Sequence, residues 1–181
     1  MLTRLLCSLG LAVLGVFPSL ASADDKRDVV GDLWGIELLG KTPNYVDLGA
    51  GVFDVFRRDR DGQTSASARA ELRIGEKLYG FGPLIGLMAN TDGGVNGYGG
   101  LYVDLAVGDI IITPIAAVSG YSQGGSSYLG GVFLFRIGLG AAYEFANKLR
   151  VGVRLSHLSN ASIHDDNPGE EEIYLTIALP F

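Results

Sequence analysis

Hydrophobic and polar residues alternate with a period of two along most of the chain after residue 43. In segment 65–74 the odd positions are polar or charged, and the even positions are alanine, leucine or isoleucine. In segment 133–145 the odd positions are apolar, and the even positions include Arg136 and Glu144. Because successive side chains of a β-strand point to opposite faces, this pattern predicts strands with one apolar and one polar face.

Eight segments follow this pattern, and most are near the length of about 9–11 residues at which a tilted strand spans a bilayer. They comprise residues 44–56, 65–75, 80–90, 96–107, 109–120, 128–146, 149–159 and 171–181. An even number of antiparallel strands can close on itself, and closure removes the unpaired edges that hydrocarbon does not tolerate. We therefore expect an all-β fold, an eight-stranded antiparallel transmembrane β-barrel over residues 44–181.

The polar face of these segments carries charges of both signs in equal number. Its charged members are Asp47, Arg69, Glu71, Arg73, Asp104, Arg136, Glu144 and Arg154. Unpaired charges in a narrow interior are costly, whereas a balanced set can pair. An eight-stranded barrel is just wide enough for side chains to fill it. The apolar face is thus expected to meet lipid, and the interior to be filled.

The connections between the segments alternate between short and mostly longer ones. Short periplasmic turns and longer outer loops are typical of outer-membrane barrels, which places loop 160–170 at the cell exterior. The final Phe181 follows apolar residues at every second position, as at the C-terminus of such barrels. We expect a location in the outer membrane of a Gram-negative cell. Residues 24–43 do not alternate, so a short amphipathic helix and an extra strand both stay open.

The first 23 residues have the anatomy of a secretory signal peptide. Arg4 is followed by an apolar run over 5–20 and by the small-residue cleavage signal 21–23. A transmembrane anchor is the alternative, but the run is short. The only cysteine, Cys7, lies in this segment, so the mature chain has no disulfide and no thiolate ligand. The net charge of −6 argues against nucleic acid as a partner.

Three residues that can act in catalysis meet at one rim of the predicted barrel. His157 and Ser159 share the lipid face at the end of segment 149–159, and Glu171 begins the lipid face of the last segment. Serine becomes a nucleophile when an adjacent base takes its proton, and a carboxylate often orients that base. Asn160 stands next to the serine, where it could stabilise an oxyanion. The simpler alternative is that polar residues mark the headgroup boundary, where strands turn polar.

The motif His-Leu-Ser-Asn-Ala at 157–161, followed by Asn-Pro-Gly-Glu-Glu at 167–171, resembles the PagL family of outer-membrane lipid A 3-O-deacylases. The resemblance extends over about residues 128–181. It implies an esterase that removes the acyl chain at the 3 position of lipid A, with lipopolysaccharide of the outer leaflet as the partner and with no metal or other cofactor. The roles that it implies are Ser159 as nucleophile, His157 as general base, Glu171 as the group that orients the histidine, and Asn160 in the oxyanion hole.

This chain departs from the family pattern at one position, and a second position is ambiguous. Ser162 stands where the family commonly has glycine. Three consecutive glutamates occupy 170–172, and strand alternation favours Glu171 as the outward-facing one.

Two other functions stay open. One is a non-enzymatic small barrel with a structural or adhesive role, whose acidic loop 160–170 is a solvated tip. Oxygen ligands suit calcium, but the spacing of the acids matches no calcium loop. The other is an esterase of the same fold that acts on phospholipid or another acyl ester. We expect His164 to be a surface residue of this loop, and a homodimer is left open.

Overall fold

The computed structural model describes residues 27–56 and 64–181, so the predicted signal peptide lies outside the described residues. Within these two ranges no helix could serve as a membrane span. The described elements are β-strands: β1 (Val29–Leu33), β2 (Ile36–Leu39), β3 (Tyr45–Phe53), β4 (Ser65–Arg73), β5 (Gly82–Asn90), β6 (Val95–Tyr102), β7 (Leu105–Val107), β8 (Ile110–Ser122), β9 (Phe133–Glu144), β10 (Arg150–Ser159) and β11 (Glu170–Pro180).

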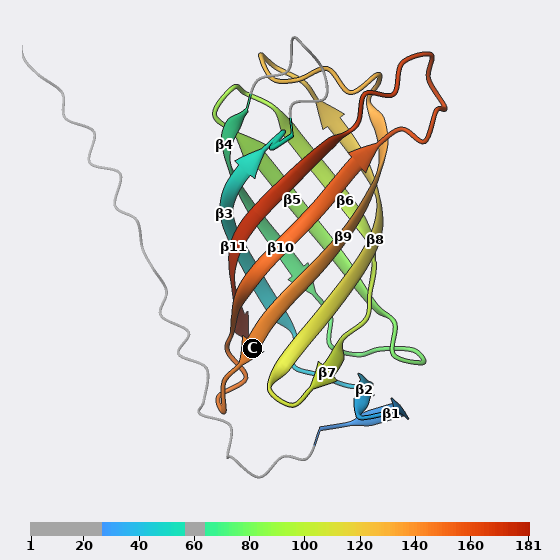
Figure 1. The fold of residues 1–181 in the computed structure, drawn as a ribbon, viewed down its shortest axis with the longest axis vertical. Coiled ribbons are helices and arrows are strands. Elements are labelled where there is room, and N and C mark those ends of the chain that lie inside the picture. Colours follow the sequence, from blue (N-terminus) through green and yellow to red (C-terminus); the bar gives the residue numbers. More distant parts are fainter. Residues whose placement is uncertain (1–26, 57–63) are drawn as a thin grey trace, which may run out of the picture.

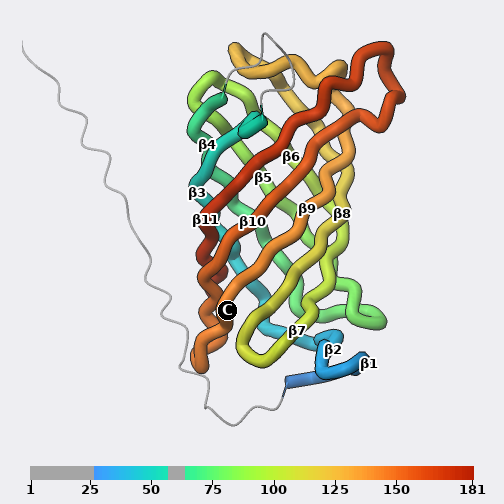
Figure 2. The backbone as a smooth tube through the Cα atoms, in the orientation of Figure 1, coloured from blue at the N-terminus to red at the C-terminus, as the bar shows by residue number. Residues whose placement is uncertain are grey.

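Eight antiparallel strands close into a barrel, which confirms the predicted fold (Figures 1 and 2). Closure is made by pairing of β11 with β3, the last strand with the first of the barrel, in a register that sets Val46 opposite Leu179. β6 and β7 form one strand of the wall, interrupted at residues 103–104. The end of β3 and the loops that follow β5, β8 and β10 lie at one end, and the described N-terminal hairpin and the C-terminus lie at the other (Figure 1).

The structure decides the question left open for the N-terminal segment. β1 and β2 form a hairpin, and β2 pairs with β7. β5 begins at Gly82 opposite Tyr102, so it leaves the edge of β7 uncovered, and β2 covers that edge. Covering an open strand edge satisfies backbone groups that would otherwise lack partners, which explains why this segment forms strands rather than a helix.

The charged residues predicted for the interior are all buried, and oppositely charged side chains pair there. Arg69 donates to Asp47 at 2.5 Å, and Arg73 also pairs with Asp47. Toward the end where the C-terminus lies, Arg150 pairs with Asp104 at 3.1 Å. The predicted filled interior is confirmed in the described chain, and its polar contents are arranged as ion pairs.

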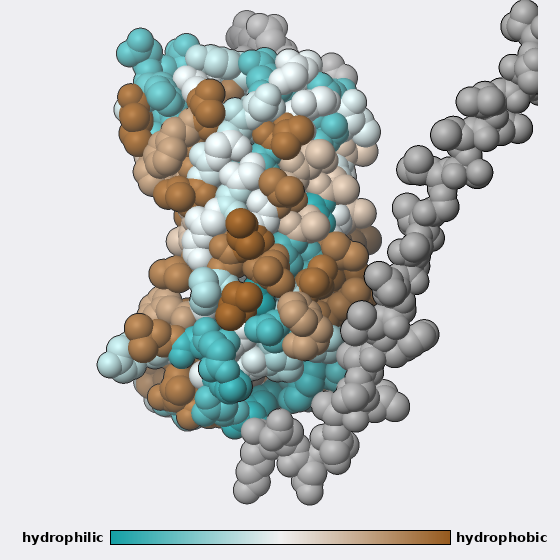
Figure 3. Space-filling view, turned by 180° about the vertical axis from the view of Figure 1, so that it is seen from behind, coloured by the Kyte–Doolittle hydropathy of each residue, from teal (hydrophilic) through white to brown (hydrophobic). Residues whose placement is uncertain are grey.

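Most apolar residues of the barrel strands lie on the outside, as the alternation predicts. Leu175 on β11 is 72% exposed, and Leu87 on β5 and Ile137 on β9 are also exposed. Figure 3 shows hydrophobic side chains spread over the outer wall between the two ends. Apolar surface of this extent is stable when hydrocarbon covers it, so the outer wall is the lipid-facing surface of the barrel.

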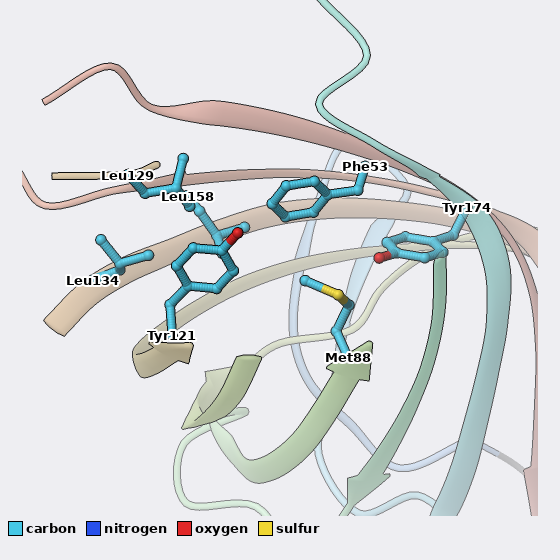
Figure 4. Packing of buried hydrophobic residues seen from close by; sticks show 7 residues of the cluster. All are labelled: Phe53, Met88, Tyr121, Leu129, Leu134, Leu158 and Tyr174. Atoms are coloured by element: carbon cyan, nitrogen blue, oxygen red, sulfur yellow. The ribbon is translucent and has the colours of Figure 1, made fainter. Parts of the chain in front are cut away.

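Under the outer loops the interior also contains apolar side chains. A buried cluster there consists of Phe53, Met88, Tyr121, Leu129, Leu134, Leu158 and Tyr174 (Figure 4). The rings of Phe53 and Tyr121 stack at 6.0 Å. Leu158 belongs to this cluster and is fully buried. Because Leu158 lies between His157 and Ser159 on β10, its packing holds the outer end of that strand in place.

Candidate active site

The residues predicted to act in catalysis lie at the outer ends of β10 and β11 and point away from the lumen. His157 and Ser159 are partly exposed, and Leu158 and Asn160, which alternate with them, are buried. On β11, Glu171 is partly exposed between Glu170 and Glu172, which are both buried. The alternation therefore sets three functional groups on the lipid-facing side of the rim.

His157 and Glu171 form a hydrogen-bonded pair across the two strands. They are direct partners in the β10–β11 register, and Nδ1 of His157 lies 3.2 Å from Oε1 of Glu171. A carboxylate can only accept, so the pair assigns the imidazole proton to Nδ1. Nε2 then keeps its lone pair and is free to take up a proton. The side chains of His157 and Glu171 are 31% and 15% exposed, so the carboxylate is the more shielded of the two.

Ser159 lies one outward position further along β10, opposite Phe135 of β9. In the described chain no hydrogen bond joins its hydroxyl to the imidazole of His157. Catalytic hydrogen bonds are often long in the absence of substrate and tighten when it binds. The structure thus brings together the imidazole of His157 and the carboxylate of Glu171, and places Ser159 on the same face of β10.

Asn160 joins the two outer loops that flank the site. Its side-chain amide donates to the carbonyl oxygens of Leu129 at 3.1 Å and Asp166 at 2.7 Å. Its backbone N–H donates to Oδ1 of Asn167 at 2.9 Å. The donors of Asn160 are thus engaged within the protein. The oxyanion role stays a prediction, and it requires that one of these bonds be released when substrate binds.

Two glycines of loop 123–132 allow this close approach. A Cβ on Gly130 would lie 1.9 Å from the carbonyl oxygen of Asp166, and one on Gly131 would lie 2.3 Å from the ring of His164. Any side chain at these positions would push the loops apart. His164, expected at the surface, is only partly exposed, and its Nε2 is buried. Its imidazole packs where a side chain of residue 131 would otherwise lie.

A tight turn follows Asn160. Ile163 N–H donates to the carbonyl oxygen of Asn160 at 3.0 Å, and Ala161 and Ser162 have φ of 51° and 61°. Positive φ at both central residues defines a type I′ turn, which favours asparagine and glycine. Ser162, at the position where the family commonly has glycine, therefore adopts a backbone conformation that glycine takes at lower cost.

Gly169 packs directly against the imidazole of His157. Its φ is 65°, and a Cβ there would lie 3.0 Å from Cε1 of His157. We expect Gly169→Ala to displace the ring and to lower the rate of ester hydrolysis roughly tenfold, which corresponds to about 1.4 kcal/mol. Steady-state kinetics on purified protein would measure this loss.

A matched control is available at the other end of the barrel. Gly108 has φ of 59°, and a Cβ there meets nothing within 4 Å. Gly108→Ala carries a similar backbone cost without touching His157, so its activity should stay at the wild-type level. Equal losses in the two variants would show that backbone strain, and not contact with the imidazole, causes the effect.

Parts of this arrangement have no clear signal in the sequence. Asn167 and Gly169 are visible as motif residues, but their contacts to Asn160 and His157 are not. Gly130 and Gly131 fall within the predicted strand segment 128–146, but the structure places them in the loop before β9, so the sequence does not show what they approach. The acceptor role of the Leu129 carbonyl depends wholly on the fold.

Fold and site together define a small outer-membrane β-barrel with an outward-facing histidine–carboxylate pair. The family model described as lipid A 3-O-deacylase (PagL) matches residues 93–180, which include the whole site. Among solved structures, the crystal structure of the outer membrane enzyme PagL is similar, with a TM-score of 0.59 and 24% sequence identity. The match covers 76% of this chain and 99% of that chain. A comparison with curated proteins gives no match.

These findings confirm the resemblance to the PagL family. The family match extends upstream of the region 128–181 in which the motifs were recognised, since it begins at residue 93. The solved structure confirms the fold over the barrel.

Proposed function

We propose that this protein is an outer-membrane serine esterase that hydrolyses the acyl ester at the 3 position of lipid A. The observation that carries the proposal is the hydrogen bond between His157 and Glu171 on the lipid-facing rim, two residues from Ser159. It lies in the segment that the deacylase family model matches. A lipid in the outer leaflet reaches this position from the side and does not have to enter the filled barrel.

The first half of the reaction transfers the acyl group to serine. Nε2 of His157 takes the proton of the Ser159 hydroxyl as Oγ attacks the ester carbonyl carbon. Glu171 accepts the Nδ1 hydrogen bond and stabilises the imidazolium that forms. The tetrahedral intermediate collapses, the bond from the carbonyl carbon to the sugar oxygen breaks, and the imidazolium protonates that oxygen to give the sugar hydroxyl. The products of this half are the deacylated lipid and an acyl-serine.

The second half removes the acyl group with water. His157 takes a proton from a water molecule that attacks the acyl-serine carbonyl, and the imidazolium then returns a proton to Oγ. The fatty acid leaves, and Ser159 is regenerated. Apolar residues beside the site suit an acyl chain: Phe135 lies opposite Ser159 and Ile137 opposite His157 on β9, on the outward face.

An esterase of the same fold acting on phospholipid is the second candidate, since the exposed apolar wall suits any acyl chain. Purified protein in detergent micelles should be incubated with lipid A and, separately, with a phospholipid. We expect release of the 3-linked fatty acid from lipid A and little from phospholipid, both measured by mass spectrometry. Hydrolysis of phospholipid alone would contradict the lipid A assignment. A folded protein that hydrolyses neither lipid would support the non-enzymatic barrel.

A further inference from the structure

Two hairpin tips at the end opposite the candidate active site expose large apolar side chains. One is the β1–β2 tip, where Leu33 is 61% and Trp34 is 92% exposed. The other is the turn between β4 and β5, where Leu78 is 71% and Tyr79 is 82% exposed. The ribbon shows both projecting to the same side of the barrel (Figure 1). In the view from behind, hydrophobic side chains gather on this projecting lower flank (Figure 3).

The two tips have the same unusual turn chemistry. Trp34 and Gly35 have φ of 54° and 84°, and Tyr79 and Gly80 have φ of 53° and 86°. Both are type I′ geometries, in which the first position favours asparagine, aspartate or glycine. A bulky residue with positive φ is uncommon. Both tips therefore carry an aromatic residue against the local backbone preference, which indicates a use for the exposed ring.

The base of the β1–β2 hairpin is packed and hydrogen-bonded against the barrel. Leu39 of β2 is buried with Ala106 and Ile111. Arg27, just before β1, donates to the carbonyl oxygen of Gly108 at 2.6 Å and pairs with Glu144 at 3.2 Å. These contacts fix the base of the hairpin, so its tip is presented in a defined direction.

The turn between β4 and β5 lies against β2 of the β1–β2 hairpin. A Cβ on Gly80 would lie 2.9 Å from Leu38, so the turn 78–81 rests on the side chain of β2. Within that turn Leu78 and Phe81 exchange backbone hydrogen bonds at 2.9 and 3.0 Å. The exposed apolar side chains of the hairpin tip and of this turn are Leu33, Trp34, Ile36, Leu78, Tyr79 and Phe81. We call them together the lower apolar patch.

The lower apolar patch continues the lipid-facing wall. Leu38 pairs with Leu105 of β7, on the outward face of the barrel, and Ile36 shares that face of β2. The carboxylates lie on the other face of the hairpin. In the strand register Asp32 is opposite Glu37, and Glu37 is opposite Ala106, whose side chain is buried inside the barrel. The hairpin is therefore amphipathic, with its apolar face in line with hydrocarbon.

We propose that the lower apolar patch is embedded in the boundary between headgroups and acyl chains of the inner leaflet, where it anchors the periplasmic end of the barrel. Tryptophan and tyrosine favour this boundary because they combine an apolar ring with a polar tip. Aromatic girdles flank the apolar band of outer-membrane barrels. Elsewhere on this end Tyr143 and Phe145 pack edge to face at 4.9 Å and are also exposed.

Trp34 is the only tryptophan of the chain, which makes its fluorescence a direct test. The full-length mature protein would be reconstituted in vesicles of phosphatidylcholine with bromine at defined positions of the acyl chain. We expect blue-shifted emission, and quenching several-fold stronger with bromine near the headgroup than near the chain terminus. Added iodide should quench little.

Two calibration variants set the limits of depth. Trp34→Phe combined with Leu175→Trp places the reporter on the lipid-facing wall of β11, where Leu175 is 72% exposed. Trp34→Phe combined with Asn147→Trp places it at the exposed turn between β9 and β10. The depth that bromine quenching gives for Trp34 should lie between the depths of the reporters at residues 175 and 147. Bromine near the headgroup should quench Trp34 most strongly.

Two outcomes would overturn the proposal. Red-shifted emission that iodide quenches would show that the tip lies in water. Blue-shifted emission without quenching by bromine at any depth would show that a protein partner or a second copy covers the patch. Because Trp34 is 92% exposed, neither its replacement nor its use as a reporter disturbs the barrel.

Discussion

Ester hydrolysis should fall by at least about a thousandfold when Ser159 is replaced by alanine, because the acyl-enzyme can no longer form. His157→Ala should cost a similar factor, since the hydroxyl loses its base. Residues that act as a unit give non-additive losses, so the double variant should be no slower than either single variant. Steady-state kinetics with a soluble acyl ester on purified protein would measure all three.

The control is a serine on the same face that has no part in the relay. Ser122 lies at the outer end of β8 and is exposed, so Ser122→Ala should keep wild-type activity. Circular dichroism should show an intact barrel for every variant. A Ser159→Ala protein that retains a tenth or more of the activity would require a different nucleophile. Losses for Ser159 and His157 that multiply in the double variant would contradict a shared relay.

Of the substitutions proposed for this protein, we expect Glu172→Ala to lower the free energy of unfolding the most. Arg136 is buried and donates twice to the Glu172 carboxylate, at 2.5 and 3.2 Å. Breaking a buried pair by removing one partner leaves an uncompensated charge, which costs about 3–5 kcal/mol. Glu172→Ala should therefore lower the free energy of unfolding by that amount, measured by urea unfolding in lipid vesicles.

Two further variants test whether the loss of stability comes from an unpaired charge that is buried. Replacing both Arg136 and Glu172 by leucine removes the unpaired charge, so most of the lost stability should return. Glu76 pairs with Lys41 at the surface, with both side chains largely exposed, and water screens such a pair. Glu76→Ala should change stability little. Equal losses from Glu172→Ala and Glu76→Ala would mean that the interior pair is not the source of stability.

Most of the fold could be predicted from the alternation of polar and apolar residues along each strand. The polar face of each segment is buried and the apolar face exposed, because a barrel in lipid inverts the usual rule for every strand at once. The alternation does not predict where a strand begins, nor whether the edge of a strand is covered. β9 starts at Phe133, so residues 128–132 belong to the loop although they lie in a predicted strand segment. The β1–β2 hairpin forms because the edge of β7 is open, a consequence of how far β5 extends.

The site was predictable to the extent that it depends on one pair of strands. Parity places His157, Ser159 and Glu171 on one face, and the resemblance supplies their roles. What could not be predicted depends on contacts between loops. Asn160 stands beside the serine in sequence, yet its amide donates to the carbonyl oxygens of Leu129, in the loop before β9, and Asp166, in the loop after β10. Such long-range contacts leave no periodic pattern.

The most direct measurement is mass spectrometry of lipid A from Gram-negative cells that carry the wild-type protein, the Ser159→Ala variant or no added protein. Wild type should yield lipid A lacking the one fatty acid linked at the 3 position, while the other two samples retain it. Unchanged lipid A in cells that contain folded wild-type barrel would contradict the assigned reaction. So would loss of that chain in the Ser159→Ala cells.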